Sequence, residues 1–395
     1  MGEERGTRMI GMERSTFMVD RHGLPYIGAI LTALALLLSP AAVVADSANS
    51  MSAAAPSQGQ GPSTMQSFDG AKGWLNSKPL APSDLTGKVV LVDVWEYTCI
   101  NCLRTLPYLK AWYSRYHSDG FEIIGVHTPE FGFSGDTKNV TDATKRLGVE
   151  WPVALDDDGT IFKRYNAGGW PAEFLYDQKG NLVETQHGEG NYPQTEAKIQ
   201  SLLKAQNKSL KLPTVMALLP QDSYDKPGAV CYPQTPEMFV GTWHGVNIAN
   251  QPTGRDASGA LDFEDPGKHA DNSIYLQGYW QESPDRQGMI TAGTGDYLSL
   301  NYEAIQVVGI LKPESGGAQR VDVTQDGKPV SHDDAGPDLQ FDPSGNSFIT
   351  VDAPRAYDII MNKHYGKHDL RLSPQRYNVG IYDFAFESCE VGSDK

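Results

Sequence analysis

Two cysteines separated by two residues form the most reactive pattern in this sequence. They lie in Cys99-Ile100-Asn101-Cys102, and a two-residue spacer on a helix brings two sulfur atoms close enough to exchange a disulfide. A strand-like run precedes the pair and a helical pattern follows it, so both thiols should lie where a helix begins. Free N–H groups and the helix dipole favour a thiolate there. We expect Cys99, at the exposed edge, to be the nucleophile and Cys102 to be the resolving thiol.

Other uses of this pair are less consistent with the sequence. A structural zinc site needs more ligands, and the two remaining cysteines, Cys231 and Cys389, are far apart, so we expect no metal. A structural bridge across two residues closes too small a loop to stabilise much. No cofactor is expected either. The pair alone leaves these alternatives open, and the surrounding residues decide between them.

The predicted elements around the pair alternate between strands and helices. Residues 89–95 read Val-Val-Leu-Val-Asp-Val-Trp and predict a strand buried on both faces. Leu106, Leu109 and Trp112 then have the spacing of a helix. Further strands are predicted at residues 121–126, 151–155, 174–176 and 182–185, and further helices at residues 140–147 and 195–204. This order predicts an α/β domain with a mixed central sheet and helices on both faces.

The sequence changes character beyond Leu212. Five prolines from residue 213 to residue 236 indicate an extended crossing segment, and short alternating runs separated by Gly, Pro and Asp follow it. The runs are residues 273–280, 297–302, 305–311, 320–323, 347–351 and 378–386. They predict an all-β sandwich. Trp243, Tyr279, Trp280 and Tyr302 would suit an aromatic platform, but alternating aromatics in a sandwich are more typical of a core, so no ligand site is assigned to them.

Longer motifs relate the reactive pair to a known family. The segment from Val90 to Cys102 resembles thioredoxins, with an acid, Asp93, six residues before the first cysteine and a proline, Pro107, five residues after the second. The DipZ-type redox proteins, relatives of TlpA-like reductases, have an extracytoplasmic part that is similar to four further motifs here. These are Trp74-Leu75-Asn76-Ser77, Arg104-Thr105-Leu106-Pro107-Tyr108, Gly125-Val126-His127-Thr128-Pro129-Glu130-Phe131 and Trp170-Pro171-Ala172. The resemblance implies a thioredoxin-like fold followed by a jelly roll similar to carbohydrate-binding modules.

The resemblance also implies roles for residues outside the cysteine pair. Asp93 would be a buried carboxylate beneath the dithiol, with a raised pKa that lets it exchange protons with Cys102. The alternative is a solvated acid at a strand end. Pro171 would be a cis proline that faces the dithiol, and Trp170 would help to shape the client groove, whereas the alternative is a trans proline in an ordinary loop. Glu130 would be a second proton-handling carboxylate, although an exposed loop acid is equally consistent with its position.

Several residues near the dithiol depart from the thioredoxin pattern. Thr98 replaces the tryptophan that usually precedes the first cysteine, and Glu96 and Tyr97 are expected near the rim of the active site. These departures leave the reduction potential and the choice of client open. His127 is interpreted as a structural histidine at a strand end, because nothing around it indicates a metal.

The N-terminal residues indicate export rather than a folded element. An apolar run at residues 27–38 follows several arginines, and Ser39-Pro40 and small residues suited to cleavage end the segment. We predict a signal peptide at residues 1–45 and a periplasmic or secreted location, with an uncleaved membrane anchor as the alternative. Residues 46–66 lack bulky apolar side chains and predict a flexible linker. The other predicted parts are a thioredoxin-like domain at 67–208, a connecting segment at 209–236 and an all-β sandwich at 237–395.

Charge and the two remaining cysteines bear on partners and compartment. A net charge of −16 and a pI near 5.0 disfavour nonspecific binding to nucleic acid or anionic lipid. Cys231 and Cys389 flank the predicted β domain in a chain expected to mature in an oxidising compartment. We therefore predict a structural disulfide between them, with two free thiols as the alternative.

Two functions from different classes fit the sequence. In the first, the chain is an exported thiol-disulfide oxidoreductase, favoured as a reductase of disulfides in client proteins. A separate membrane electron donor is then expected, because the sequence has no multi-span module like that of DipZ-type proteins. In the second, the chain is a binding module for a glycan or the cell envelope with an accessory redox domain. The residues around the dithiol favour the first.

Overall fold

The computed structural model describes residues 60–391 apart from residues 220, 221, 223–225, 227, 244–246 and 316. The predicted signal peptide and most of the predicted linker lie outside these residues. All of these residues belong to one compact unit. Among the described residues, no helix has the length and apolar character that crossing a membrane requires.

A mixed sheet forms the first half of the described chain, as predicted. Its strands, in sheet order, are β1 (Gly73–Leu75), β4 (Val153–Leu155), β3 (Phe121–His127), β2 (Val89–Trp95), β5 (Ala172–Tyr176) and β6 (Leu182–His187). Strands β2, β3 and β4 run parallel, whereas β1, β5 and β6 pair in antiparallel fashion with their neighbours. Strand β1 was not predicted, because three residues are too few to show the alternation that is typical of a strand.

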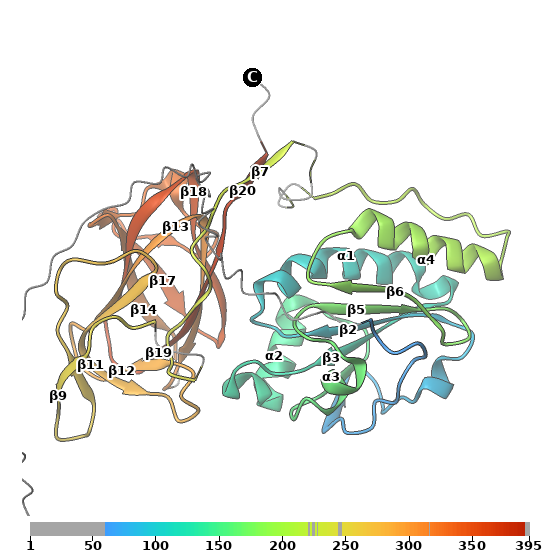
Figure 1. The fold of residues 1–395 in the computed structure, drawn as a ribbon, viewed down its shortest axis with the longest axis horizontal. Helices are drawn as coiled ribbons and strands as arrows, with labels where there is room; N and C mark the ends of the chain where they lie inside the picture. Colours follow the sequence, from blue (N-terminus) through green and yellow to red (C-terminus); the bar gives the residue numbers. More distant parts are fainter. Residues whose placement is uncertain are drawn as a thin grey trace, which may run out of the picture. The chain divides into compact units, whose positions relative to one another are not determined.

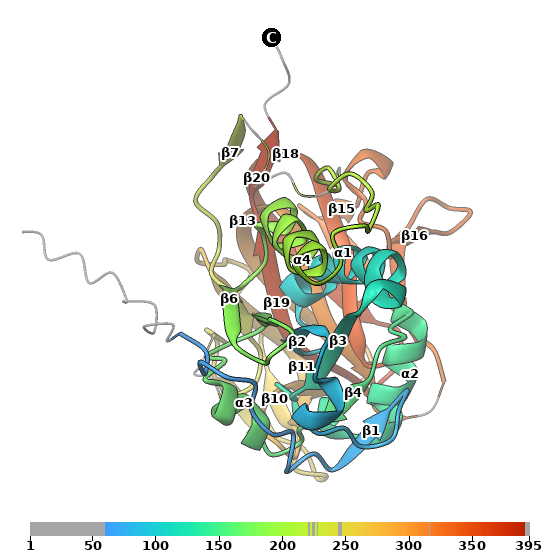
Figure 2. The ribbon, with the colours of Figure 1, turned by 90° about the vertical axis from the view of Figure 1, so that its right-hand side faces the viewer.

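Helices cover both faces of this sheet. They are α1 (Ile100–Tyr116), α2 (Thr137–Leu147), α3 (Thr160–Tyr165) and α4 (Tyr192–Gln206). Short 3-10 turns lie at Pro82–Leu85, His117–Asp119 and Gly132–Gly135, and a further one lies in the β domain at His332–Asp334. Buried side chains of α1, α2 and α4 pack with Val89 and Leu91, and those of α3 pack with Val90 and Val92. Figures 1 and 2 show α1 and α4 side by side on one face. The continuous apolar run of β2 follows from this cover, because successive side chains point to opposite faces.

The predicted flexible linker ends earlier than residue 66. The backbone N–H of Met65 donates to the carbonyl of Gly180 at 2.9 Å, and the N–H of Leu182 donates to the carbonyl of Ser63 at 2.9 Å. Residues 63–65 therefore pair with the turn between β5 and β6. This pairing was not predicted, because it uses backbone groups, which leave no pattern in the sequence.

The connecting segment after α4 packs against the first domain. Its partly buried side chains lie on the same apolar cluster as α1 and α4, and include Leu210, Leu212, Met216, Leu218 and Leu219. The N–H of Leu219 donates to the hydroxyl of Tyr108 on α1 at 2.8 Å, and the Tyr108 hydroxyl also bonds the Asp222 carboxylate. The proline-rich segment is therefore extended, and these contacts hold it against the helices.

The second half of the described chain is β structure, as predicted. Its strands are β7 (Ala229–Cys231), β8 (Met238–Phe239), β9 (Pro252–Arg255), β10 (Leu261–Phe263), β11 (Ser273–Glu282), β12 (Met289–Thr291), β13 (Tyr297–Pro313), β14 (Gln319–Gln325), β15 (Lys328–Pro329), β16 (Gln340–Phe341), β17 (Ser347–Val351), β18 (Arg355–Pro374), β19 (Val379–Glu387) and β20 (Cys389–Val391). Strands β13, β19, β12 and β11 pair in a closed ring, a small barrel. The jelly roll stays a prediction.

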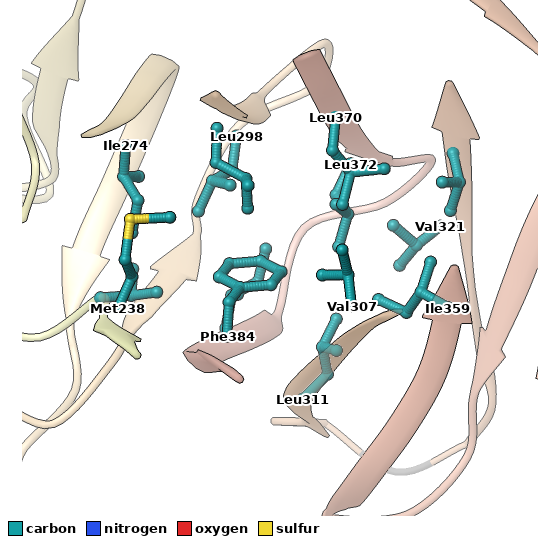
Figure 3. Packing of buried hydrophobic residues seen from close by; sticks show 14 of the residues in the cluster. Met238, Ile274, Leu298, Val307, Leu311, Val321, Ile359, Leu370, Leu372 and Phe384 are labelled. Carbon is teal, nitrogen blue, oxygen red and sulfur yellow. The ribbon is translucent and has the colours of Figure 1, made fainter. Parts of the chain in front are cut away.

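Two long strands correct the sequence-based assignment of this β domain. Residues 297–302 and 305–311, predicted as separate strands, belong to the single strand β13, which shifts register near Ala304 instead of turning. Strand β18 was not predicted, because charged and polar residues interrupt its alternation where its middle is exposed. Figure 3 shows side chains of β11, β13, β14, β18 and β19 directed toward one another in the core.

The aromatic residues of the β domain divide between core and surface. Trp280 and Tyr302 are buried in the apolar cluster, in line with the reading of alternating aromatics as core. Trp243 and Tyr279 are exposed, at 67% and 38% of their surface. The four residues therefore do not form one platform.

Candidate active site

The two cysteines lie at the first turn of α1. Cys99 is the N-cap residue, and its Sγ accepts the backbone N–H of Cys102 at 3.3 Å. The carbonyl of Cys99 accepts the N–H of Leu103 at 3.0 Å, which starts the helical ladder. Both thiols are free, with Cys99 partly exposed and Cys102 buried. A sulfur in the N-cap position receives a backbone donor and the positive end of the helix dipole, as a nucleophilic thiolate requires.

A buried carboxyl group lies on β2 behind the dithiol. Asp93 is 1% exposed, and neither of its carboxyl oxygens has a hydrogen-bond partner in the described part of the chain. Burial raises the pKa of Asp93 to about 7. Burial, together with Cys99 and Asp93, raises the pKa of Cys102 well above that of a free thiol. Asp93 is thus not the solvated strand-end acid considered above, and it can change protonation near neutral pH.

A second buried carboxyl group, Glu173, lies beside Asp93. The two residues are opposite each other in the antiparallel pair β2 and β5. Glu173 is 4% exposed, and its Oε1 lacks a hydrogen-bond partner among the described residues. Burial, Asp93 and Glu184 raise its pKa well above the ordinary value. Glu173 was not predicted as a site residue, although an acid within the apolar strand Ala172–Tyr176 is a usable signal.

Glu96 and Tyr97 are buried, not at the rim of the site. The Oε2 atom of Glu96 accepts the backbone N–H and the hydroxyl of Thr98, and it also accepts the N–H of Cys99 at 3.0 Å. Burial raises the pKa of Glu96 in spite of these donors. Its other oxygen lies 3.9 Å from Nε2 of His127. Burial lowers the pKa of His127 to about 3, so this imidazole is neutral and forms no ion pair. Glu96 therefore shapes the loop that presents Cys99.

The other predicted site residues come from the loops around α1. The peptide bond between Trp170 and Pro171 is cis, and the Pro171 carbonyl accepts the N–H of Gly188 at 2.8 Å. The Trp170 ring packs 5.2 Å from that of Phe162, measured between centroids. Glu130 follows β3 and is half-buried. Burial, Glu96 and Glu237 raise the pKa of Glu130 to about 8.

Residues of both domains line a small pocket beside Cys99. Its volume is about 120 Å³. From the thioredoxin-like domain it is lined by Thr98, Cys99, Ile100, Asn101, Glu130, Phe131 and Trp170, and from the β-domain side by Glu237, Ile310, Asp383 and Ala385. The sequence could not identify Glu237 or Asp383 as site residues, because only the tertiary fold brings them to Cys99.

Polar contacts hold the β domain against this site. Arg104 on α1 donates to Glu189 at 2.8 Å, to Glu387 on β19 at 3.2 Å and to Gln306 on β13 at 3.2 Å. The Gln287 side chain accepts the N–H of Gly132 at 2.6 Å and donates to the carbonyl of Glu130 at 2.8 Å. A side chain in place of Gly132 would collide with Asp285, since a Cβ atom there would lie 2.4 Å from its Oδ2. The loop that carries Glu130 is therefore fitted to the β domain.

The remaining two cysteines lie on strands. Cys231 on β7 and Cys389 on β20 are opposite each other in an antiparallel pair, and a disulfide joins them. Their Cα atoms are 4.0 Å apart and 158 residues separate them in sequence. Across the described residues, no group of three or more His, Cys, Asp or Glu side chains is arranged to hold a metal ion.

Comparison with known proteins gives this site its family. Residues 63–203 match the Redoxin family, and residues 235–386 match a family described as a thioredoxin like C-terminal domain. Protein DipZ of Mycobacterium bovis is 34% identical over 326 residues, which are 82% of this chain and 42% of DipZ, so the chain spans less than half of that relative. A solved thiol-disulfide isomerase from Corynebacterium glutamicum, 24% identical, covers 38% of this chain and 97% of its own with a TM-score of 0.33. The thiol-disulfide oxidoreductase ResA of Bacillus cereus is 31% identical over 32% of this chain and 71% of ResA. The chain belongs to the family of thioredoxin-like thiol-disulfide oxidoreductases.

Proposed function

We propose that this chain is an exported thiol-disulfide oxidoreductase that reduces disulfides in client proteins. The observation that carries the proposal is the position of Cys99, whose sulfur caps α1 and accepts the N–H of Cys102 above the buried Asp93. A nucleophilic thiol, a second thiol within reach and a proton acceptor are the three parts that dithiol exchange needs.

The proposed reaction transfers two electrons from the dithiol to the client. The Cys99 thiolate attacks one sulfur of the client disulfide, forms a mixed disulfide and releases the other client sulfur as a thiolate. Cys102 then attacks the Cys99 sulfur, the client leaves as a dithiol, and Cys99 and Cys102 end as a disulfide. Each client sulfur gains one electron and one proton, and a reductant must return the two electrons to the dithiol before the next cycle.

Asp93 accepts the proton that Cys102 loses in the second step. A buried thiol with a raised pKa is a poor nucleophile until a base removes its proton, and Asp93 has a pKa of about 7, suited to that exchange. Glu130 is proposed as a second proton-handling carboxylate, which its place in the pocket and its pKa of about 8 support. Trp170 and Pro171 are proposed to shape the groove for the client chain.

Export and partners also belong to the proposal. The apolar N-terminal run supports a signal peptide, and the disulfide between Cys231 and Cys389 supports an oxidising compartment such as the periplasm or the exterior. The reductant is proposed to be a separate electron donor in the membrane. We propose a jelly-roll topology for the β domain, which requires antiparallel pairing like that of β13 and β18.

Reduction of insulin by dithiothreitol, with the whole chain as catalyst, tests the activity. We expect the wild-type chain to accelerate precipitation of the insulin B chain and Cys99→Ser to give only the uncatalysed rate. Equal rates for the two would overturn the proposal. The direction is tested by the equilibrium of the Cys99 and Cys102 pair with glutathione. A potential more reducing than that of a typical oxidase, about −120 mV for DsbA, is expected, and a value near that figure would assign oxidation instead.

A further inference from the structure

The β domain places an acidic wall in front of the dithiol. Strands β8 and β19 pair with Met238 opposite Phe384 and Phe239 opposite Asp383. This register brings Glu237, the residue just before β8, to the stretch 383–385 that lines the pocket. Glu130 reaches the same pocket from the thioredoxin-like domain. Three carboxyl groups therefore surround the space next to the Cys99 sulfur.

One of these carboxyl groups, Asp383, interacts with Glu237 and with the backbone of Phe384, yet one of its oxygens accepts no hydrogen bond from the part of the chain that the structure describes. Asp383 is 2% exposed, and its Oδ1 has no hydrogen-bond partner among the described residues. Burying an acceptor without a donor costs free energy, so an unsatisfied oxygen on a pocket wall indicates a group that comes from outside. The residues that line the pocket include no lysine, arginine or histidine to serve as that group.

The chemistry of the wall favours a cation as its ligand. Burial, together with Glu237 and Glu130, raises the pKa of Asp383 well above the ordinary value. A buried carboxyl group such as Asp383 holds its proton in these surroundings, and it can ionise when a positive charge enters and compensates for the lost solvation. An ammonium or guanidinium group also brings several N–H donors, which would satisfy Oδ1 of Asp383.

The pocket is sized for a short group. Its volume of about 120 Å³ is well below the 300–1,000 Å³, roughly, of sites that enclose a drug-sized molecule. It can accept the end of a side chain or of a small disulfide, but not a folded segment. Because Cys99 is part of the lining, a group held there must lie within a few bonds of the sulfur that Cys99 attacks.

We propose that Glu237 and Asp383 make this oxidoreductase selective for disulfides that carry a cationic group close to the sulfur under attack. The inference rests on the proposed function, since it assumes attack by Cys99, and it gives the β domain a direct part in choosing the substrate. The cation comes either from a small aminothiol disulfide or from a lysine or arginine next to the client cysteine. The positive charge, bound by the carboxyl groups, holds the disulfide in position for attack by the Cys99 sulfur.

Cystamine is the simplest probe for this selectivity. The Cys99 thiolate attacks one cystamine sulfur, a mixed disulfide with cysteamine forms on Cys99, and one cysteamine leaves as a thiolate. A Cys102→Ser background stops the reaction at this stage, so that intact mass measures the rate of attack alone. Bis(2-hydroxyethyl) disulfide and 3,3′-dithiodipropionate are neutral and anionic probes of similar length. N-acetylcysteine, tested with the same probes at the same pH, gives the intrinsic reactivity of each disulfide.

We expect the rate ratio of cystamine to the neutral probe to exceed that for N-acetylcysteine by about tenfold or more, and the anionic probe to react more slowly than the neutral one. Glu237→Gln and Asp383→Asn should each lower the ratio, and the pair together should bring it to the value for the free thiol. Asp333→Asn is the matched control. It removes one negative charge from an exposed site of the same domain that is not part of the pocket, and it should leave the ratio unchanged.

The outcomes separate the inference from the proposed function. A wild-type ratio equal to that of N-acetylcysteine, or a ratio that survives both substitutions, would overturn the cation selectivity while leaving the oxidoreductase intact. Failure of Cys99 to react with any of the probes would overturn the proposed function itself. Glu237→Gln alone keeps the test valid if Asp383→Asn does not fold, because Glu237 is exposed.

A pair of disulfide-linked peptides with lysine or norleucine next to the cysteine then distinguishes the two sources of the cation. A preference for the lysine peptide assigns a client side chain, and a preference confined to cystamine assigns a small aminothiol.

Discussion

The two pairs of cysteines in this chain show how the surroundings of a thiol decide its chemistry. Cys99 and Cys102 are three positions apart at the start of a helix and are free thiols. Cys231 and Cys389 are 158 residues apart, face each other across β7 and β20, and form a disulfide. The first pair has a backbone donor at its sulfur and a buried acid behind it, whereas the second pair joins two antiparallel strands. We therefore attribute the proposed reactivity of the first pair to the helix start and to Asp93.

The largest expected difference between the pairs is in catalysis. Cys99→Ser should lower the rate of insulin reduction at least about 10³-fold, because no other thiol can start the exchange. The double variant Cys231→Ser with Cys389→Ser, assayed below its unfolding midpoint, should keep a rate close to that of the wild type. Rates measured with dithiothreitol as reductant check both. A large loss of rate in the double variant would mean that the second pair also takes part in the reaction.

The same double variant should lose stability. By the chain-entropy model, a cross-link that closes a loop of 158 residues restricts the unfolded chain enough to stabilise the fold by about 5 kcal/mol. Urea unfolding of the variant and of the unreduced wild type, followed by near-ultraviolet circular dichroism, measures the difference. A change below about 1 kcal/mol would indicate that the bridge does not restrain the unfolded chain. Cys99→Ser is the control, since that thiol closes no loop.

Removal of Asp93 should stabilise the chain at high pH. The folded carboxyl keeps its proton up to about pH 7, against an ordinary value of 3.8. Ionisation of the buried group therefore destabilises the fold progressively as the pH rises from about 4 to about 7. The full loss of folding free energy is about 4 kcal/mol, and it persists at every pH above about 7. Asparagine has no proton to lose, so Asp93→Asn should be more stable than the wild type at pH 8 by up to this amount.

The pH dependence provides the check on the Asp93 prediction. Urea midpoints of both proteins should converge near pH 4, where the carboxyl is protonated in the folded and the unfolded chain. A constant difference between pH 4 and pH 8 would show that the substitution acts through packing. In stopped-flow measurements Asp93→Asn should also slow the decay of the mixed disulfide more than its formation, because the proton acceptor for Cys102 is lost.

The smallest expected effect concerns the loop acid Glu96. Glu96 contributes to the raised pKa of Glu130, so Glu96→Gln should lower that pKa from about 8. The amide oxygen can still accept the N–H groups of Thr98 and Cys99, which preserves the loop. Titration of the Glu130 carboxyl by NMR measures the shift. Glu122→Gln is the matched control, as a buried acid on β3 that does not act on Glu130. An equal shift in both variants would argue against a direct interaction between Glu96 and Glu130.

Local patterns in the sequence predicted the parts of the site that depend on neighbouring residues. The run at 89–95 predicted β2, and the spacing of Cys99 and Cys102 before a helical pattern predicted the start of α1, because burial on both faces and helical periodicity are visible over a few residues. The hairpin of β5 and β6 was predicted for the same reason, from two short apolar runs on either side of Lys179-Gly180-Asn181.

The parts that could not be predicted depend on contacts between distant segments. Glu237 and Asp383 meet because β8 pairs with β19, and no local pattern specifies that register. Glu96 was expected at the rim because acids are usually solvated, yet three donors from the loop keep it buried. The pairing of residues 63–65 uses backbone groups alone. Composition could not indicate it.

Trapping of mixed disulfides tests the central assignment most directly. Clients or a model disulfide protein are mixed with Cys102→Ser and with Cys99→Ser under otherwise identical conditions, and covalent adducts are identified by mass spectrometry of unreduced samples. The assigned roles predict adducts on Cys99 of the Cys102→Ser chain and none on the Cys99→Ser chain, because attack proceeds without resolution only in the first. Equal adducts with both variants would contradict the account, since either thiol would then be able to attack.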